Sequence, residues 1–379
     1  MSRQRRRKAK DIDFKQAAAV NKLLDQSQVD LDRLRLQASG KGLGNRELRS
    51  KAWLVLLGLD QESFLREQYL SLAEGLHRDT AVVEVDVQRS LWSYTEGWTD
   101  AKRGSSRAQL KSLLNAAIGH HNGQAFYYQG LHDIASVLLF EIGERPAFLV
   151  LRHLVRNHLR DFTRPTLEPV MELLELLMPL LEQADLELYH HVASSGAPPY
   201  FALSWLITWF AHNVPGLEQI TRLFDLFMAS HPLMPLYVAV IAMRASRITL
   251  LKCELDAAEM HRALHNLSIT AFATADELAH QATLLFGHCP PAAIICSKHI
   301  TMDKSCAAEA RQVDGYWQVP EVPQPQKFGP KHTLRRWSYQ GLSFAAAALV
   351  LAAVLSSRAM TDRTFGAGSG FLTHMPPLL

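Results

Sequence analysis

The sequence has little cysteine and lacks the patterns that mark metal or disulfide sites. Its 379 residues include four cysteines at irregular spacing, with no C-x-x-C pair. This spacing argues against both a zinc ribbon and a disulfide framework. The adjacent pairs His120–His121 and His190–His191 lack the i, i+4 spacing and the acid of a zinc-hydrolase helix. We therefore expect no resident metal ion.

Signatures of other chemistries are also missing. The glycine-rich segment Gly40–Gly44 has no Lys-Ser or Lys-Thr pair after it and no strand before it, so it does not match a phosphate-binding loop. No G-x-S-x-G elbow of a serine hydrolase is present. The net charge of +3 is too small to indicate nucleic acid as the main partner. We expect the chain to hold no nucleotide or cofactor of its own.

The residues that are present favour a helical domain. At 48% hydrophobic, the chain can bury a sizeable core. Between residues 45 and 286 apolar positions recur at helical spacing, and almost nothing is typical of a sheet. Asn45 is a predicted N-cap, and Pro169–Leu181 is amphipathic. Tyr200–Ala211 is apolar nearly all round and predicts a buried core helix. We predict an all-α domain over residues 45–286.

The segment before this domain, residues 1–44, combines a basic tail with leading helices. Arginines and lysines crowd the first ten residues, as in a solvated tail or in a contact with anionic lipid or an acidic protein surface. Phe14–Leu36 has the spacing of one or two amphipathic helices. The glycines of Gly40–Gly44 then predict a hinge before the main domain.

The C-terminal part predicts a membrane anchor. Prolines without apolar periodicity indicate a linker over residues 287–336. Trp337–Ser357 follows, with 21 residues and no charge. As a helix it reaches roughly 31 Å, close to the hydrocarbon thickness of about 30 Å. Basic residues before it place the large domain in the cytosol, and residues 358–379 form a short tail. The alternative is a buried alanine-rich helix.

Two short stretches carry the candidate chemistry. Asp86 stands three residues before Arg89, a spacing that brings a carboxylate beside a guanidinium. Gln129 stands before Gly130, which lets the backbone approach a ligand while the amide orients a water. Residues 82–87 alternate as a strand would, but with no partner strand in sight we predict a loop. Trp92–Ser106 also predicts a surface loop.

These stretches resemble the signature motifs of the TBC-domain GTPase-activating proteins for Rab GTPases. The patterns I-x-x-D-x-x-R and Y-x-Q-G are matched by Val83, Asp86 and Arg89 and by Tyr127, Gln129 and Gly130. The pattern R-x-x-x-W is matched by Arg49 and Trp53. Later motifs are matched by Ser204–Trp205 and Arg222–Asp225, and Asp133 also matches a family aspartate. Five motifs in the family's order over about two hundred residues make a specific signal.

The resemblance implies a function that the residues alone do not specify. In this family an arginine and a glutamine enter the partner's nucleotide site in trans, here Arg89 and Gln129. Asp86 would aim Arg89, while Tyr127 and Gly130 would shape the loop that presents Gln129. The chain would thus activate an enzyme rather than be one, with GTP and Mg²⁺ held by a GTP-bound Rab.

A C-terminal span is unusual in this family. The stretches around Arg89 and Trp205 resemble a branch anchored in the endoplasmic reticulum that acts on Rabs of early secretory traffic. Two alternatives stay open: an inactive helical scaffold that binds a Rab-like partner, and a membrane adaptor unrelated to GTPases.

Overall fold

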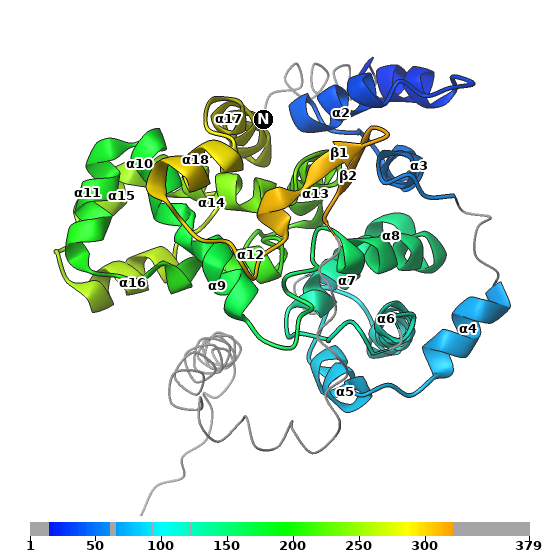
Figure 1. The fold of residues 1–379 in the computed structure, drawn as a ribbon. Helices are drawn as coiled ribbons and strands as arrows, with labels where there is room; N and C mark the ends of the chain where they lie inside the picture. Colours follow the sequence, from blue (N-terminus) through cyan, green and yellow to red (C-terminus); the bar gives the residue numbers. More distant parts are fainter. Residues whose placement is uncertain (1–14, 61–65, 92–93, 122, 321–379) are drawn as a thin grey trace, which may run out of the picture. The chain divides into compact units, whose positions relative to one another are not determined.

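The computed structural model describes residues 15–60, 66–91, 94–121 and 123–320 (Figure 1). Within the described parts of residues 45–286 all regular structure is helical, which confirms the all-α prediction for the domain. In the described ranges no helix is long and apolar enough to cross a membrane. The basic tail of residues 1–10, the predicted anchor Trp337–Ser357 and the tail 358–379 lie outside those ranges.

The segment that leads into the domain is fixed by contacts with a distant helix. Residues 15–24 are helical, and helix α2 (Leu31–Gly40) follows, capped by the Asp30 side chain, which accepts from Arg33 N. Arg222 donates to the last carbonyls of α2, those of Ala38, Ser39 and Gly40. A Cβ on Gly42, at φ +81°, would lie 2.9 Å from the Arg222 side chain. The predicted hinge is therefore packed against the domain.

The first group of domain helices packs around α6 and α7. It comprises α3 (Arg46–Leu56), α4 (Arg66–Glu74), α5 (Thr80–Gln88), α6 (Asp100–Gly119), α7 (Leu131–Ile142) and α8 (Glu144–Arg156). As predicted, Asn45 caps α3 by accepting from Leu48 N. Helix α6 packs on α4, α5, α7 and α8, and α7 packs on α3 and α8 as well. Helix α7 is apolar on nearly every face, and it is therefore buried among its neighbours as a central helix of the core.

Two predicted loops are helical. Residues 82–87 lie inside α5, where Val83 and Val87 are buried and Val82 and Val85 are exposed. The alternation predicted from the sequence is thus a helical stripe of period 3.6, and the loop prediction was wrong. The surface-loop prediction for Trp92–Ser106 was also wrong from Asp100 onward, where α6 begins. The capping residue Thr99 and the buried Arg103 are polar, and polar residues in a sequence are typical of a surface loop.

The second group of helices packs around α14. It comprises α9 (Glu168–Glu175), α10 (Leu177–Ala184), α11 (Leu186–Ser195), η3 (Pro199–Ala202), α12 (Leu203–Ile207), α13 (Leu217–Ala229), α14 (Met234–Ala245), α15 (Arg247–Leu250), α16 (Ala257–His265), α17 (Ala275–His288) and α18 (Pro291–Lys298). Helix α14 packs on α10 and α17. Helix α13 contacts α2, α3 and α7 as well as α14 and α17, so it joins the two groups.

The buried segment Tyr200–Ala211 is not the single helix that its composition predicts. It consists of the end of η3, then α12, then Trp209 and Phe210 at φ +48° and +64°. Both aromatic side chains are buried and pack on Phe227 of α13. Apolar composition therefore predicted burial correctly for residues 201–211, although Tyr200 is 48% exposed, and the chain leaves the helix where the two rings pack.

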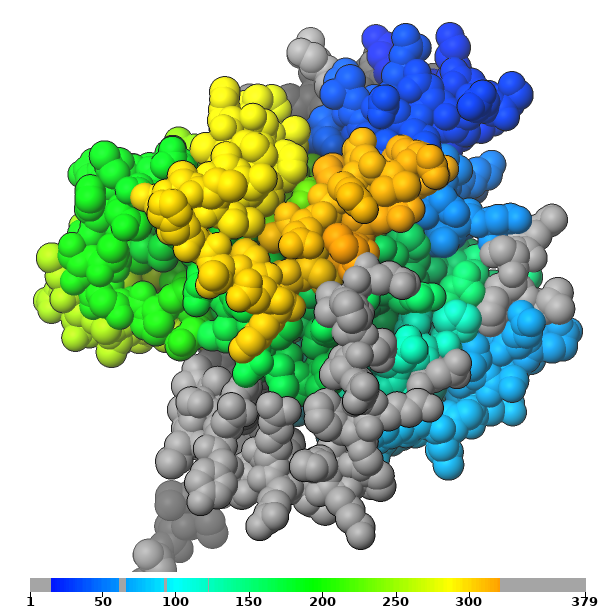
Figure 2. All heavy atoms as spheres, viewed as in Figure 1, coloured from blue at the N-terminus to red at the C-terminus, as the bar shows by residue number. Residues whose placement is uncertain are grey.

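The prediction of an irregular linker fails for the described part of residues 287–336. After α18 come η4 (Ala307–Glu309) and an antiparallel hairpin of β1 (Arg311–Val313) and β2 (Tyr316–Gln318). In Figure 2 this segment, yellow to orange, runs across the face of the domain. The buried carboxylate of Asp161 accepts from Ser305 Oγ at 2.7 Å and from Ala307 N at 3.1 Å. Hydrogen bonds of this kind produce no apolar periodicity in the sequence, so the sequence did not predict that this segment is ordered. Residues 321–336 lie outside the described ranges.

Candidate functional site

Arg89 stands at the C-terminal end of α5, where a buried acid holds it. Its side chain is 54% exposed, while that of Asp86, one turn earlier, is 3% exposed. Arg89 Nη2 lies 2.5 Å from Asp86 Oδ1, so the predicted contact is present. A charged hydrogen bond to a fixed carboxylate restricts the rotamers of the arginine, and its remaining donors are left toward solvent.

The second carboxylate oxygen of Asp86 connects α5 to the Gln129 loop. Tyr127 Oη donates to Asp86 Oδ2 at 2.8 Å, and Ser90 Oγ donates to the backbone oxygen of Asp86 at 2.6 Å. Burial, and then the neighbouring Asp86 carboxylate, raises the pKa of Tyr127 far above its ordinary value. Tyr127 is thus a neutral hydroxyl donor at physiological pH, and the carboxylate is shared between Tyr127 and Arg89.

The loop that carries Gln129 is fixed on both sides. Tyr127 N donates to Asp79 Oδ2 at 2.9 Å. Gly130 is the N-cap of α7 at φ +114°, and a Cβ there would lie 3.1 Å from Thr208 Cγ2. A glycine is required for both reasons. Gln129 between them is partly exposed, and its side chain makes no hydrogen bond to another described residue. The amide is thus presented at a rigid position.

Two residues after Gly130 lies His132, which the sequence analysis did not single out. Its Nδ1 lies 3.0 Å from Tyr127 Oη and 3.7 Å from Asp86 Oδ2. Its Nε2 lies 3.6 Å from Oδ1 of Asp133, whose other oxygen lies 3.8 Å from His212 Nδ1. The predicted supporting residue Asp133 thus sits beside this cluster and contacts it through His132. His132 contacts Tyr127, five positions earlier, and no sequence pattern predicts a contact at that spacing.

Arg49 and Trp53 were predicted to support the site, and the structure places them in a buried network. Arg49 Nε lies 3.0 Å from Asp225 Oδ1, and its Nη1 lies 2.9 Å from Glu141 Oε1. Trp53 Nε1 donates to Asp225 Oδ1 at 2.9 Å. The motif residues Arg49, Trp53 and Asp225 therefore meet, and they tie α3 to α7 and α13. This network holds helices together and contains neither Arg89 nor Gln129.

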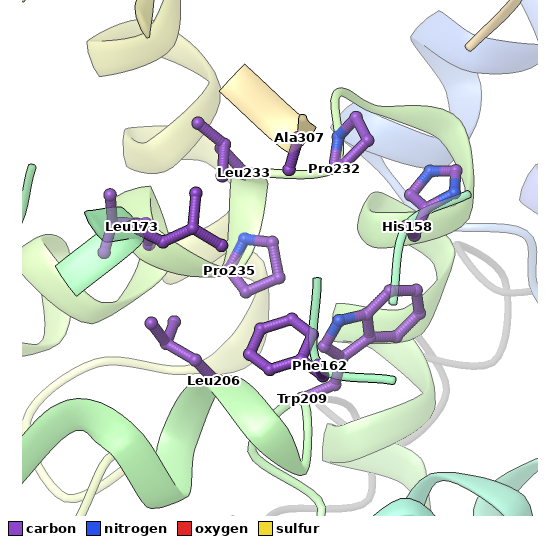
Figure 3. Close-up of a pocket in the computed structure, with 10 residues that line it drawn as sticks. His158, Phe162, Leu173, Leu206, Trp209, Pro232, Leu233, Pro235 and Ala307 are labelled. Carbon is purple, nitrogen blue, oxygen red and sulfur yellow. The ribbon is translucent and has the colours of Figure 1, made fainter. Parts of the chain in front are cut away.

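Neither Arg89 nor Gln129 lines either of two hollows found in the described part of the chain. One is a cavity of about 10 Å³, room for roughly one water, between His158, Trp209 and the segment 232–236 (Figure 3). The other is an open groove of about 450 Å³ at the C-terminal end of α7, lined by Trp98 and Phe140 among others. Arg89 and Gln129 therefore lie outside both hollows.

Comparison with known proteins found matches to the helical domain. Residues 46–251 match the family model of the Rab-GTPase-TBC domain. Over 254 residues the chain is 34% identical to TBC1 domain family member 20 of Mus musculus and of Homo sapiens. These matches cover 67% of this chain and 63% and 62% of the relatives, so the chain spans less than two thirds of their length. It is 36% identical over 213 residues to the GTPase-activating protein gyp10 of Schizosaccharomyces pombe, 56% of each chain.

Solved structures share the fold. The Chlamydomonas flagellar RabGAP TBC domain superposes with a TM-score of 0.59 at 19% identity, over 74% of this chain and 94% of that one. The Ypt/Rab-GAP domain of Gyp1p superposes with a TM-score of 0.59 at 14% identity, over 73% and 98%. At these identities the superpositions establish the helical architecture and nothing finer.

Proposed function

Because this chain belongs to the Rab-GTPase-TBC domain family, we propose that it is a GTPase-activating protein for Rab GTPases in their GTP-bound state. It acts as an activator, and the hydrolysis takes place in the partner's nucleotide site. GTP and Mg²⁺ belong to that partner, and the chain needs no cofactor of its own.

In this proposal Arg89 and Gln129 supply the chemistry. The transition state of phosphoryl transfer spreads charge over the γ-phosphoryl oxygens and needs an in-line water. Arg89 neutralises that charge, and Gln129 orients the water. The observation that carries the proposal is the shared carboxylate of Asp86. One of its oxygens holds the half-exposed Arg89, and the other binds Tyr127 of the Gln129 loop.

The other site residues position these two. Asp86 fixes the rotamer of Arg89, and Tyr127 fixes the loop against α5. Gly130 allows the loop to pass within contact distance of Thr208. Asp133 faces the ring of His132 from α7. Arg49 and Trp53 act further away, through the helix packing that holds α7 in place.

The uncharged run of residues 337–357, and the resemblance of the stretches around Arg89 and Trp205 to a branch anchored in the endoplasmic reticulum, motivate a narrower proposal for location and substrate. Residues 337–357 anchor the protein in the endoplasmic reticulum membrane with the TBC domain in the cytosol, and the partners are Rabs of early secretory traffic. The full-length protein then stays with membranes through an alkaline carbonate wash, and a chain that ends before Trp337 is released. Recovery of the full-length protein in the carbonate supernatant would contradict the anchor.

The function is tested by measuring GTP hydrolysis by a panel of purified Rabs with and without the fragment of residues 15–320. We expect stimulation of at least one Rab, with the early secretory members foremost. If GTP-loaded Rabs bind the fragment and none is stimulated, the chain is the inactive scaffold that the sequence left open. If none binds, an adaptor unrelated to GTPases is indicated.

A further inference from the structure

We propose that His132 is a positioning residue that links the Gln129 loop to Arg89 through Tyr127 and Asp86. The inference rests on the proposed function, which assigns hydrolysis to Arg89 and Gln129. His132 touches neither of these side chains. It acts through a chain of hydrogen bonds that runs from α7 across the loop to the end of α5.

The direction of these hydrogen bonds follows from counting protons. Tyr127 Oη carries one proton and donates it to the carboxylate oxygen Asp86 Oδ2 at 2.8 Å. The 3.0 Å contact between Tyr127 Oη and His132 Nδ1 therefore needs a proton on Nδ1. His132 donates to Tyr127, Tyr127 donates to Asp86, and Arg89 donates to the other oxygen of Asp86. Gly130 N also donates toward His132 Nδ1, at 3.4 Å, and this longer hydrogen bond would need an unprotonated Nδ1, so it competes with the shorter contact to Tyr127.

Two of the groups that face the ring, Asp86 and Tyr127, agree with this assignment, while Asp133 faces the other ring nitrogen. Asp86 from α5, Tyr127 from the loop and Asp133 from α7 all present oxygen atoms to it. Both the neutral ring protonated at Nδ1 and the doubly protonated ring donate to Tyr127. The side chain of His132 is 11% exposed, so water competes little for these bonds. A ring in this setting fixes the Tyr127 hydroxyl toward Asp86.

This chain has a consequence for the site. Tyr127 lies two residues before Gln129, and Asp86 lies one helical turn before Arg89. Any shift of Tyr127 moves both the loop and the carboxylate that aims Arg89. Because hydrogen bonds in series polarise one another, the donor at the start of the chain strengthens the bonds that follow. His132 therefore sets the relative position of the two side chains that enter the partner.

The test compares two substitutions of nearly equal size. His132→Asn keeps an N–H donor near the position of Nδ1, and His132→Leu removes it. We expect His132→Leu to lower kcat of stimulated hydrolysis about tenfold, with less change in KM, because the loss is felt in the transition state. His132→Asn should recover most of the rate. His191→Leu is the matched control, since His191 lies in α11 and its Nε2 contacts the backbone oxygen of Cys253 at 3.1 Å.

A double-mutant cycle separates positioning from folding. If His132 acts through Tyr127, then His132→Leu has little further effect on kcat in a Tyr127→Phe background. Independent effects of the two substitutions, equal rates for wild type and His132→Leu, or an Asn variant as slow as the Leu variant would each overturn the inference. A wild-type protein that stimulates no GTPase overturns the proposed function instead, and this inference with it.

A second measurement does not depend on hydrolysis. Long-range ¹H–¹⁵N spectra of the histidine rings report which nitrogen carries the proton, and His132→Asn identifies the signal. We expect a proton on Nδ1. A ring protonated on Nε2 alone would reverse the direction of the bond to Tyr127 and refute the chain.

Discussion

Tyr127 and Asp86 are 41 positions apart in the sequence, and a 2.8 Å hydrogen bond joins them in the core of the site. Through this bond the carboxylate that holds Arg89 is also the acceptor that fixes the loop of Gln129. The positions of the two side chains proposed to act on the partner's GTP thus both depend on the buried carboxylate of Asp86. This arrangement gives the catalytic predictions their common logic.

Arg89→Ala should lower stimulated hydrolysis by about 10³-fold or more, because the charge on the γ-phosphoryl oxygens loses its counter-charge. Arg89→Lys should restore little, since a lysine lacks the planar fork. Gln129→Ala should also be severely impaired, and the double variant should lose far less than the product of the two losses. Single-turnover hydrolysis with a responsive Rab measures these rates.

The control for Arg89 is Arg33→Ala. Arg33 pairs with Asp30 at the same three-residue spacing on α2, and its side chain is 73% exposed. It should leave the rate unchanged. If a folded Arg89→Ala variant stimulates hydrolysis like the wild type, the proposed role of Arg89 is wrong.

Gly130→Ala should lower both stability and activity. The residue has φ +114°, and its Cβ would press on Thr208 at 3.1 Å, so the loop must shift. The backbone strain alone costs about 1–3 kcal/mol. Gly143→Ala is the control, since φ is +80° there and nothing lies within 4 Å of its Cβ. Urea unfolding should show a loss for both, whereas only Gly130→Ala should slow hydrolysis by the folded protein. Equal rates for the two variants would argue against a role for the loop.

Asp225→Ala should be strongly destabilising, by about 3–5 kcal/mol, because it leaves the buried charge of Arg49 and the N–H of Trp53 without this acceptor. Asp276→Ala removes a 68% exposed carboxylate from Arg222, whose buried guanidinium keeps three backbone carbonyls of α2 as acceptors, so a loss of about 0–1 kcal/mol is expected. Chemical denaturation of the fragment 15–320 measures both. Similar losses for the two variants would mean that burial does not set the strength of these pairs.

Acid should destabilise the fold through its buried histidines. Burial lowers the pKa of His158 to about 3, from an unfolded value of 6.5. Its Nε2 contacts the backbone oxygen of Ser230 at 3.2 Å, and its Nδ1 has no partner among the described residues. Because the unfolded chain takes up the proton first, the stability present above pH 6.5 is lost as pH falls toward 3.

His158→Gln tests this pH dependence, since it keeps a donor for Ser230 and cannot titrate in this range. Between pH 7 and pH 5 the free energy of unfolding should fall in both proteins. The fall in the variant should be about 2 kcal/mol smaller than the fall in the wild type. Denaturation curves at the two pH values decide the matter. Parallel losses in both proteins would show that His158 does not contribute.

Several features of the fold and the site follow from the sequence alone. The helical spacing between residues 45 and 286 predicts the all-α domain, and Asn45 predicts the cap of its helix α3. The three-residue spacing of Asp86 and Arg89 predicts their contact, because on a helix these positions are neighbours. Order and spacing of the motifs identify the family. All of this information is local, or is carried by short patterns that survive without contacts.

Only the tertiary structure decides which distant groups meet. Residues 82–87 form a helix because the chain offers them a buried surface on one side, which no local pattern distinguishes from a short strand. Asp161 holds residues 305–307 and turns a predicted linker into part of the domain. His132 reaches Tyr127, and Arg49 and Trp53 reach Asp225, because folding brings their helices together. Hydrogen bonds between buried polar groups depend on position in space, which spacing along the chain does not encode.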